Sequence, residues 1–293
     1  MPSSVPSAMD ELDLLERLKP HLSGRSGKLV IGAGEDDAAA WREPDGSFTI
    51  ATCDTAVEGV HFDLARQHPS DVGWRALCFA LGDLAAKGAR PTYGMISLTL
   101  PAAWPAESVD GIYRGLAELA REVGLKLVGG DTTRAPHDGS LSLMLLGSTW
   151  VEPKARASAR AGWSIGVTGP LGAASLAWAR PRPRLQLGAR LAAAGLCSGD
   201  ISDGLVRELD RFAAAAGVGA TLRLNAVPLA GGASAHAAVV SGEEVELVCC
   251  GPPPLPAGVQ AVGKLTSGGG VVVLDADGSE VELAARGYDH LAG

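Results

Sequence analysis

The sequence predicts an α/β fold built from two domains. Strand-like and helix-like segments alternate along the chain, and 39 glycines with only 4% aromatic residues indicate many tight turns and close backbone approaches. A basic, Ala-rich stretch, VEPKARASARAG at 151–162, interrupts the alternation near the middle of the chain. With 293 residues and 46% hydrophobic content, the chain is long enough for two buried cores. We therefore predict domains at 1–152 and 153–293.

The first half is expected to alternate helices with strands. Leucine recurs at helical spacing over 12–22, which predicts an opening helix from about Asp10. Ser70 is a candidate N-cap for a second helix that ends near Gly88, and an apolar face predicts a third helix over 107–123. Apolar runs predict strands at 29–32, 48–52, 93–100, 126–128 and 141–150, with the fourth of these leading into GGDTTRA.

The second half repeats this style. Strands are expected at 164–168, 221–224, 245–249 and 259–262. Helices are expected through Leu176, over 187–194, and from about Ser202 to Ala216. The final stretch, GGGVVVLDADGSEVELAARGYDHL, predicts a hairpin with DADG as its turn, followed by a short tail.

Charge and cysteine content limit the partners and the compartment. Lys and Arg total 25 against 33 Asp and Glu, a net charge of −8 that repels nucleic acid and anionic membranes. The N-terminal residues lack a basic stretch followed by an apolar core, and no apolar run is long enough to span a bilayer. Five cysteines without a C-x-x-C pattern are typical of reduced, buried thiols. We expect a cytoplasmic protein that binds neither nucleic acid nor membranes.

Five acidic motifs stand at the ends of expected elements, each with an aspartate beside a small residue. They are GEDDA, ATCDTAVEGVHF, ALGDLAAKGA, GGDTTR and GDISDGL. Small neighbours let a bulky ligand approach the backbone, and carboxylate oxygens suit Mg²⁺ shared with substrate phosphates. The motifs together indicate a site for phosphate chemistry.

Each aspartate alone has a simpler explanation. Asp200 is either a metal ligand or the N-cap of the following helix, and most single aspartates in such places are caps or solvated turns. Asp83 is harder to explain in this way, because it lies in an amphipathic helix among apolar residues, where an unpaired charge is costly. His61 is either a strand-edge residue packed beside Phe62 or part of the site. The number of motifs favours a shared metal site.

Other catalytic signatures are missing from the sequence. There is no G-x-x-x-x-G-K-[ST] motif, and in GAGEDD the acid Asp37 stands where a dinucleotide-binding loop needs its third glycine. No nucleophile elbow and no helical pair of metal-binding histidines is present. These absences disfavour the P-loop, dinucleotide-binding and hydrolase classes.

Taken in order, the motifs resemble the thiamine-monophosphate kinase family, within the ATP-binding superfamily of aminoimidazole ribonucleotide synthetase. The resemblance runs from GEDDA to SGEEVEL and GYDHL over nearly the whole chain, and VEGVHF, GGDTTR and GYDHL are the more particular signatures. It implies an N-terminal sheet domain that pairs with its copy in a homodimer, and a C-terminal α/β domain. It also implies that ATP and several Mg²⁺ ions bind in the cleft.

The reaction implied is direct in-line transfer of the γ-phosphoryl group of ATP to thiamine monophosphate, which gives thiamine diphosphate. The acceptor phosphate oxygen is already ionised, so no side-chain base is required, and the protein aligns the reactants while metals neutralise charge.

The resemblance also assigns site residues by position. The implied metal ligands are Asp37, Thr52, the Cys53 backbone, Asp54, Asp83, Asp131, Asp200 and Asp203. The implied ATP contacts are Gly130, Asp131, Arg160 and Ser202, and the implied acceptor contacts are His61, Glu243 and Tyr288.

The chain departs from the family pattern at several positions. Glu35 is an extra residue in a motif that runs Gly-Ile-Gly-Asp-Asp in the family, and Glu244 and Val245 replace the Asp-Tyr of Gly-Gly-Glu-Asp-Tyr-Glu-Leu. Ala173 replaces an aspartate, and the loop after Arg160 is short. These changes spare the metal aspartates but affect the expected nucleotide contacts and substrate fit.

Two alternatives remain open from the sequence. The first is a related ATP-using enzyme with another acceptor, which an assay with several acceptors distinguishes. The second is a homologue that binds nucleotide or thiamine phosphate without turnover, for which tight binding without ADP release is diagnostic.

Overall fold

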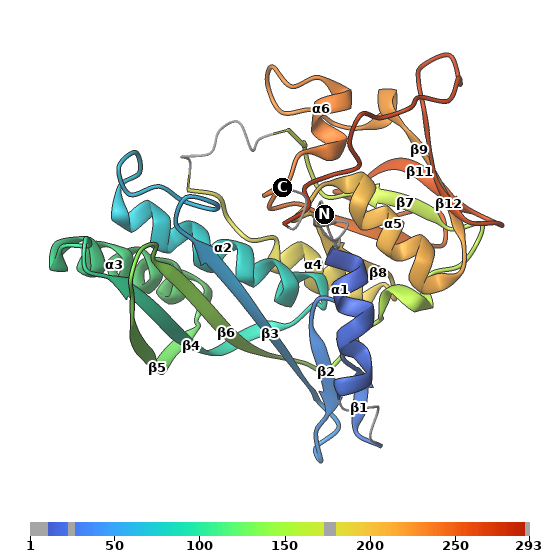
Figure 1. The fold of residues 1–293 in the computed structure, drawn as a ribbon. Coiled ribbons are helices and arrows are strands. Elements are labelled where there is room, and N and C mark those ends of the chain that lie inside the picture. Colours follow the sequence, from blue (N-terminus) through green and yellow to red (C-terminus); the bar gives the residue numbers. More distant parts are fainter. Residues whose placement is uncertain (1–10, 23–26, 173–179, 291–293) are drawn as a thin grey trace, which may run out of the picture.

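The computed structural model describes residues 11–22, 27–172 and 180–290, and it contains two six-stranded sheets (Figure 1). Its α-helices are α1 (Glu11–Leu18), α2 (Pro69–Ala86), α3 (Ala106–Val123), α4 (Leu185–Ala193), α5 (Leu205–Ala216) and α6 (Ala235–Val240). The strands of the first half are β1 (Leu29–Ile31), β2 (Ala39–Arg42), β3 (Phe48–Val57), β4 (Arg90–Pro101), β5 (Lys126–Ala135) and β6 (Ser140–Thr149). Those of the second half are β7 (Ser164–Val167), β8 (Cys197–Asp200), β9 (Gly219–Arg223), β10 (Leu247–Gly251), β11 (Gln260–Thr266) and β12 (Gly270–Leu274). The predicted α/β class is confirmed.

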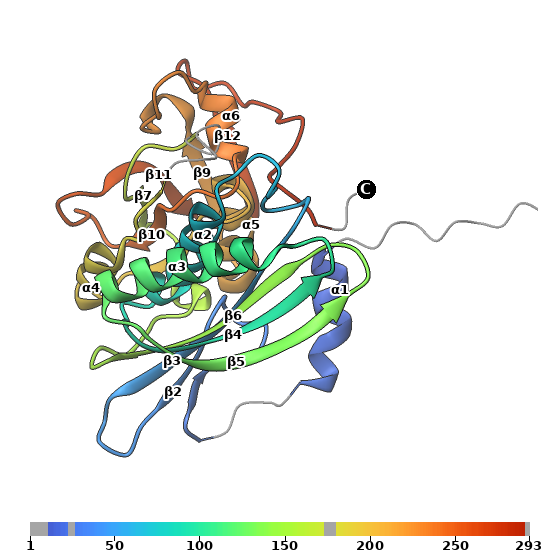
Figure 2. The same ribbon diagram turned by 90° about the vertical axis from the view of Figure 1, so that its left-hand side faces the viewer.

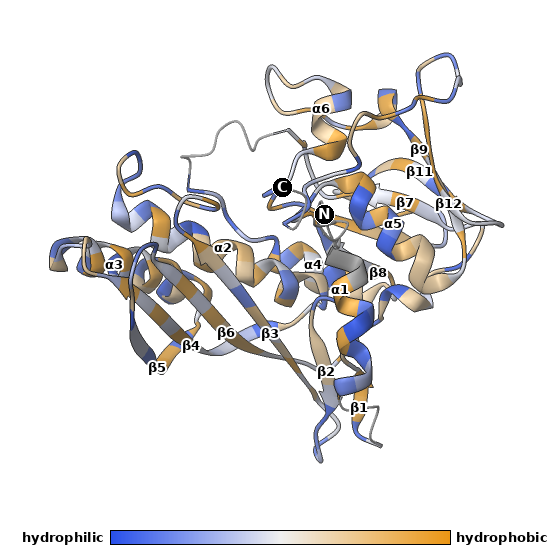
Figure 3. Ribbon diagram, in the orientation of Figure 1, coloured by the Kyte–Doolittle hydropathy of each residue, from blue (hydrophilic) through white to orange (hydrophobic). Residues whose placement is uncertain are grey.

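The first sheet has the strand order β1-β2-β3-β6-β4-β5, and its pairs are antiparallel except for β4 with β5. Figure 2 shows α2 and α3 side by side over one face of this sheet. Glycines permit the two helices to approach closely, because a Cβ on Gly73 would lie 2.0 Å from the Ile112 carbonyl oxygen. Hydrophobic residues alternate with hydrophilic ones along β3, β4 and β6, which buries one face of the sheet beneath these helices (Figure 3).

The second sheet has the order β12-β9-β11-β7-β10-β8, and its pairs are antiparallel except for β9 with β12. Helix α5 packs against it through Leu205, Leu209 and Phe212, which are fully buried in the second core. The domain boundary expected between residues 152 and 153 falls between β6 and β7, and it stays a prediction.

Helix α2 connects the two halves. Its C-terminal residues Ala85 and Ala86 form a small third core with Leu191 of α4 and with Leu247 and Cys249 of β10. The helix is therefore buried on most of its sides, and it presents Asp83 toward the second sheet. Gly82 lets α2 approach Asp200 closely, because a Cβ there would lie 3.1 Å from an Asp200 carboxylate oxygen.

Several local expectations were wrong. Helix α2 begins at Pro69, and the His68 ring, not Ser70, caps it by accepting the Ser70 N–H. Proline suits the first helical turn because a backbone N–H at that position would have no acceptor within the helix, so its absence costs no hydrogen bond. Asp54 and Asp131 lie within β3 and β5, not at element ends, because both strands are longer than expected.

The second half adds further corrections. Strand β8 was missed, so Asp200 ends a strand and α5 begins only at Leu205, with Gly204 as its N-cap. The DADG turn is present, with Gly278 N–H donating to Asp275 O, but the return arm makes only an isolated bridge, and β12 pairs with β9 instead. Strand β2 and helix α6 were also missed. The helix expected through Leu176 lies outside the described residues.

Among the described helices, none combines the length and the apolar character that a membrane span requires.

The five cysteines are free thiols, four of them buried and Cys53 exposed.

Candidate active site

A cavity of about 550 Å³ lies between the two halves. The predicted site residues that line it are Asp37, Cys53, Asp54, His61, Asp83, Asp200, Ser202, Asp203, Glu243 and Tyr288. They come from the β1–β2 loop, β3 and the loop after it, α2, the segment from β8 to α5, the loop after α6, and the C-terminal segment. The fold thus gathers residues that are up to about 250 positions apart in sequence.

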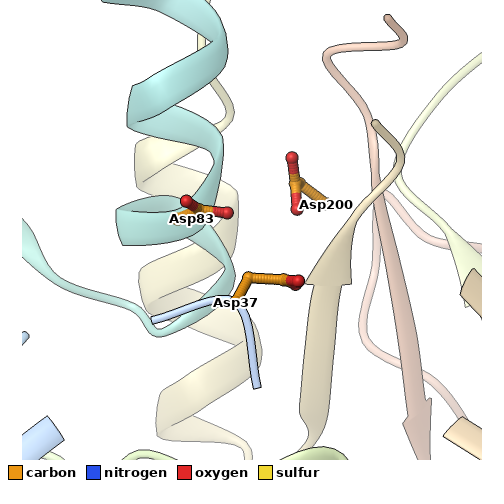
Figure 4. A group of neighbouring side chains, drawn as sticks. All are labelled: Asp37, Asp83 and Asp200. Carbon is orange, nitrogen blue, oxygen red and sulfur yellow. The ribbon is translucent and has the colours of Figure 1, made fainter. Parts of the chain in front are cut away.

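Three carboxylates converge at one side of this cavity (Figure 4). Asp37 comes from the β1–β2 loop, Asp83 from α2 and Asp200 from the end of β8. One oxygen of each lies within 4.8 Å of the others, which is a spacing that a metal ion bridges. The Thr52 hydroxyl donates a hydrogen bond to Asp83 from the neighbouring strand β3 and fixes that carboxylate.

The electrostatics of these carboxylates show an excess of negative charge. Burial and the neighbouring Asp200 and Asp37 raise the pKa of Asp83 well above its ordinary value. Burial, with Asp37 and Glu208 nearby, raises the pKa of Asp200 to about 8. Burial also raises the pKa of Asp54. A bound cation would reverse these shifts, because it favours the ionised form of every surrounding carboxylate.

Asp37 behaves differently because arginine and lysine side chains surround it. Burial opposes its ionisation, but Arg156, Lys87 and Arg211 together hold its pKa below the ordinary value. Arg156 pairs directly with Asp37 and, through Nε, with Glu208 of α5 at 2.6 Å. Arg156 therefore links the β1–β2 loop to the second half.

The three adjacent carboxylates of the GEDDA motif have three separate roles. Glu35 accepts the Gly32 N–H at 2.9 Å and closes the loop locally. Asp36 is fully buried and pairs with Lys87 Nζ at 2.6 Å, and Lys87 also donates to the Ser198 carbonyl. Only Asp37 faces the cavity.

Rings and an ion pair also line the cavity. His61, Tyr288 and His290 lie in ring contact there. Glu243 pairs with the buried Arg75 of α2 at 3.0 Å, and its backbone has a φ of 54°, a conformation that non-glycine residues rarely adopt. This geometry holds the Glu243 carboxylate between the two halves.

Four predicted residues do not line the cavity: Thr52, which instead donates its hydroxyl to Asp83, and Arg160, Gly130 and Asp131. Arg160 is exposed beyond the 3₁₀ turn Arg156–Ser158, and Gly130 packs its backbone against Ile96. Asp131 pairs in register with Ser97 of β4, so it lies on the face of the sheet opposite the buried Ile96 and α2. Ala173 lies outside the described residues.

Sequence reasoning missed the cationic partners of the site, which are Arg75, Lys87, Arg156 and Arg211, and the ring of His290. Arg211 Nη2 lies 2.7 Å from Asp203 Oδ2. Lys87 offered a signal, since a lysine in an otherwise apolar helix end requires a partner. His290 stands inside GYDHL, two positions after the predicted Tyr288.

The fold and the site define a protein of the AIR synthase-related class. Residues 35–149 match the family described as AIR synthase related protein, N-terminal domain. The chain is 34% identical over 255 residues to the thiamine-monophosphate kinase of Rhodopirellula baltica, covering 78% of this chain and 79% of that one. It is 31% identical to the thiamine-monophosphate kinase of Escherichia coli strain K12, covering 97% and 99% of the two chains. The chain belongs to the thiamine-monophosphate kinase family.

A solved structure has a similar fold over nearly the whole chain. AaThiL complexed with AMPPCP and TMP superposes with a TM-score of 0.85 at 26% identity, covering 99% of this chain and 100% of that one. The fold expected from the resemblance is confirmed over the full length.

Proposed function

We propose that this chain transfers the γ-phosphoryl group of ATP to thiamine monophosphate and forms thiamine diphosphate and ADP. Membership in the kinase family and the likeness to AaThiL complexed with AMPPCP and TMP support this activity. The observation that carries the proposal is that one cavity is lined both by the Asp37, Asp83 and Asp200 cluster and by the implied acceptor contacts. This arrangement suits an enzyme that aligns two phosphates across a metal-binding site.

The carboxylate cluster fits Mg²⁺ as the metal. All its donors are hard oxygens, and burial together with neighbouring carboxylates raises the pKa of Asp83 and of Asp200, so a cation between them would be favoured. Asp54 and Asp203 lie in the same cavity and complete the proposed ligand set, with Thr52 and the Cys53 backbone beside them. When bound, Mg²⁺ ions would supply charge neutralisation for the phosphates.

The chain's own residues would orient the reactants. Asp37, Asp83 and Asp200 fix the phosphoryl end of the cavity, and Ser202 lies beside them as the proposed ATP contact. His61, Glu243 and Tyr288 lie at the acceptor end, and Arg75 holds Glu243 there. No side chain needs to remove a proton, because the acceptor oxygen is ionised already.

The departures from the family pattern have structural roles in this chain. Glu244 is buried and accepts the Gly172 N–H at 2.7 Å and the Ser241 hydroxyl at 2.9 Å. Val245 packs against the first core. Because Glu243 keeps its place in the cavity, these substitutions favour an active enzyme over a homologue that only binds its ligands.

We expect thiamine diphosphate formation to depend completely on a divalent metal. Without it, nothing neutralises the phosphates of ATP in a cavity lined by six carboxyl groups (Asp37, Asp54, Asp83, Asp200, Asp203 and Glu243), and the ionised ones repel ATP. The first measurement is thiamine diphosphate formation from ATP and thiamine monophosphate, in Mg²⁺ and in excess chelator. The second compares the rate of ADP formation with thiamine monophosphate and with other phosphate acceptors. Undiminished turnover in chelator contradicts the metal role, and a stronger preference for another acceptor contradicts the acceptor assignment.

We also propose that two copies pair through the open face of the first sheet. On this face Tyr93 and Met95 of β4 and Met144 of β6 are 39–47% exposed, and exposed Cys53 lies in register with Met144. Apolar side chains so grouped on a sheet are typical of an interface. Asp131 lies on the same face, so its proposed roles in metal and ATP binding require a second copy.

Met144→Glu is expected to convert a dimer into a monomer, because it buries a charge in the paired sheets. Sedimentation of the parent and variant proteins measures this, with Glu107→Gln on exposed α3 surface as the control. If Asp131 acts across the interface, the monomer also loses activity. A parent protein that sediments as an active monomer contradicts the proposal.

A cytoplasmic location of the protein stays a prediction.

A further inference from the structure

The C-terminal segment around Tyr288 is anchored to the floor of the cavity. The Tyr288 N–H donates to the Asp203 carbonyl at 2.9 Å, and Asp289 pairs with Arg207 of α5 at 3.5 Å. Gly287 is required at this crossing, because a Cβ would lie 2.3 Å from the Asp203 carbonyl oxygen. The anchor directs Asp289 to α5, while Tyr288 and His290 both line the cavity.

The His290 ring lies between two rings that the sequence resemblance assigns to the acceptor. It stacks on His61 with a centroid distance of 5.3 Å and an interplanar angle of 26°. It also meets Tyr288 edge to face at 4.8 Å and 85°. His61 belongs to the first half and Tyr288 to the C-terminal segment, so His290 joins rings from the two parts of the chain.

The three rings form a wall that a flat ligand can use. The His290 side chain remains 39% exposed and Tyr288 is 49% exposed, so both rings keep free surface toward the cavity. The Val57 N–H donates to His61 Nδ1 at 3.1 Å, which fixes the orientation of that ring. His290 Nε2 lies 4.0 Å from Asp203 Oδ1, at the edge of the proposed metal ligands.

We propose that His290 is an additional acceptor-binding residue, whose ring completes the wall formed by His61 and Tyr288 and stacks with a heteroaromatic group of the acceptor. This inference rests on the proposed function, since thiamine monophosphate supplies both an aminopyrimidine and a thiazolium ring. Aromatic contacts of this kind favour flat, electron-poor or cationic rings. His290 therefore contributes to selection of a heteroaromatic phosphate over a phosphate without rings.

The test compares His290→Ala, His290→Phe and His290→Asn with the parent protein. Loss of one aromatic contact is expected to raise KM for thiamine monophosphate about threefold to tenfold in the alanine variant. The phenylalanine variant keeps a ring and should stay within about twofold of the parent, whereas asparagine keeps polar atoms without a ring and should behave like alanine. The KM for ATP should not change. His236→Ala, an exposed histidine of α6 outside the cavity, is the control.

Calorimetric titration of each protein with thiamine monophosphate alone gives a second readout. Similar dissociation constants for the parent and His290→Phe, with weaker binding by His290→Ala and His290→Asn, support the inference. Unchanged acceptor affinity in His290→Ala overturns it, and so does rescue by asparagine but not by phenylalanine, because that result assigns a hydrogen bond instead of stacking. Equal increases in both KM values indicate a structural role and also overturn it. If the parent protein makes no thiamine diphosphate, the proposed function fails, while the titration still tests His290.

Discussion

Asp83→Asn is expected to lower turnover by at least about a hundredfold while the protein stays folded. The amide keeps the shape of the carboxylate and the hydrogen bond from Thr52, but it removes one charge from the cluster with Asp37 and Asp200. Metal-mediated charge stabilisation contributes several kcal/mol to such reactions, and each 1.4 kcal/mol corresponds to a factor of ten in rate.

The measurement combines steady-state kinetics with Mn²⁺ binding followed by electron paramagnetic resonance. Asp110→Asn, an exposed carboxylate of α3, is the matched control and should change neither quantity. The metal-free variant should also unfold at a temperature no lower than the parent, because the mutation removes a carboxyl group whose ionised form burial, Asp200 and Asp37 disfavour in the folded protein. Parental turnover together with parental metal affinity would show that Asp83 is only structural.

Lys87→Met is expected to destabilise the fold by about 3 kcal/mol, because it leaves the fully buried Asp36 carboxylate without its closest cation. Lys87 and Asp36 are both 0% exposed, and the pair joins the end of α2 to the β1–β2 loop. Arg156 remains near Asp36 at 3.4 Å, which keeps the loss toward the lower end of the range for a broken buried pair.

Thermal unfolding measures this effect, with a decrease in Tm of roughly 6–10 °C for a chain of this size. Lys126→Met, an exposed lysine of β5, is the control. The double variant Lys87→Met with Asp36→Asn should recover part of the loss, because the unpaired charge is then removed. Equal destabilisation of the single and double variants would assign the loss to packing or to the Ser198 hydrogen bond instead.

The sequence predicted the elements that have a strong period. Helix α3 was placed within one residue of its start, because its apolar face repeats over 18 residues. Strands β2 (AAWR) and β8 (CSGD) are short and lack the branched apolar residues that marked the equally short β1 and β7, and the six residues of α6 are too few for a helical period. The strand around Asp131 was cut short because glycine and aspartate, which interrupt it after Val128, are depleted in strands.

Only part of the site could be predicted from the sequence, and the reason is physical. Aspartates beside small residues can be recognised from local sequence, and ten of the predicted residues line one cavity. The cations that pair with carboxylates of the site cannot, because Arg156 and Asp37 are 119 residues apart and Arg75 and Glu243 are 168 residues apart. The face on which Asp131 lies depends on sheet register, which the sequence pattern around its two glycines does not specify.

The central claim is direct phosphoryl transfer to thiamine monophosphate, and the most direct measurement follows the label from ATP that is radiolabelled at the γ-phosphate. The account predicts that the label appears in the terminal phosphate of thiamine diphosphate, with one ADP formed for each product molecule, and that chelation of Mg²⁺ abolishes both. Release of the label as inorganic phosphate with no labelled thiamine diphosphate would contradict it.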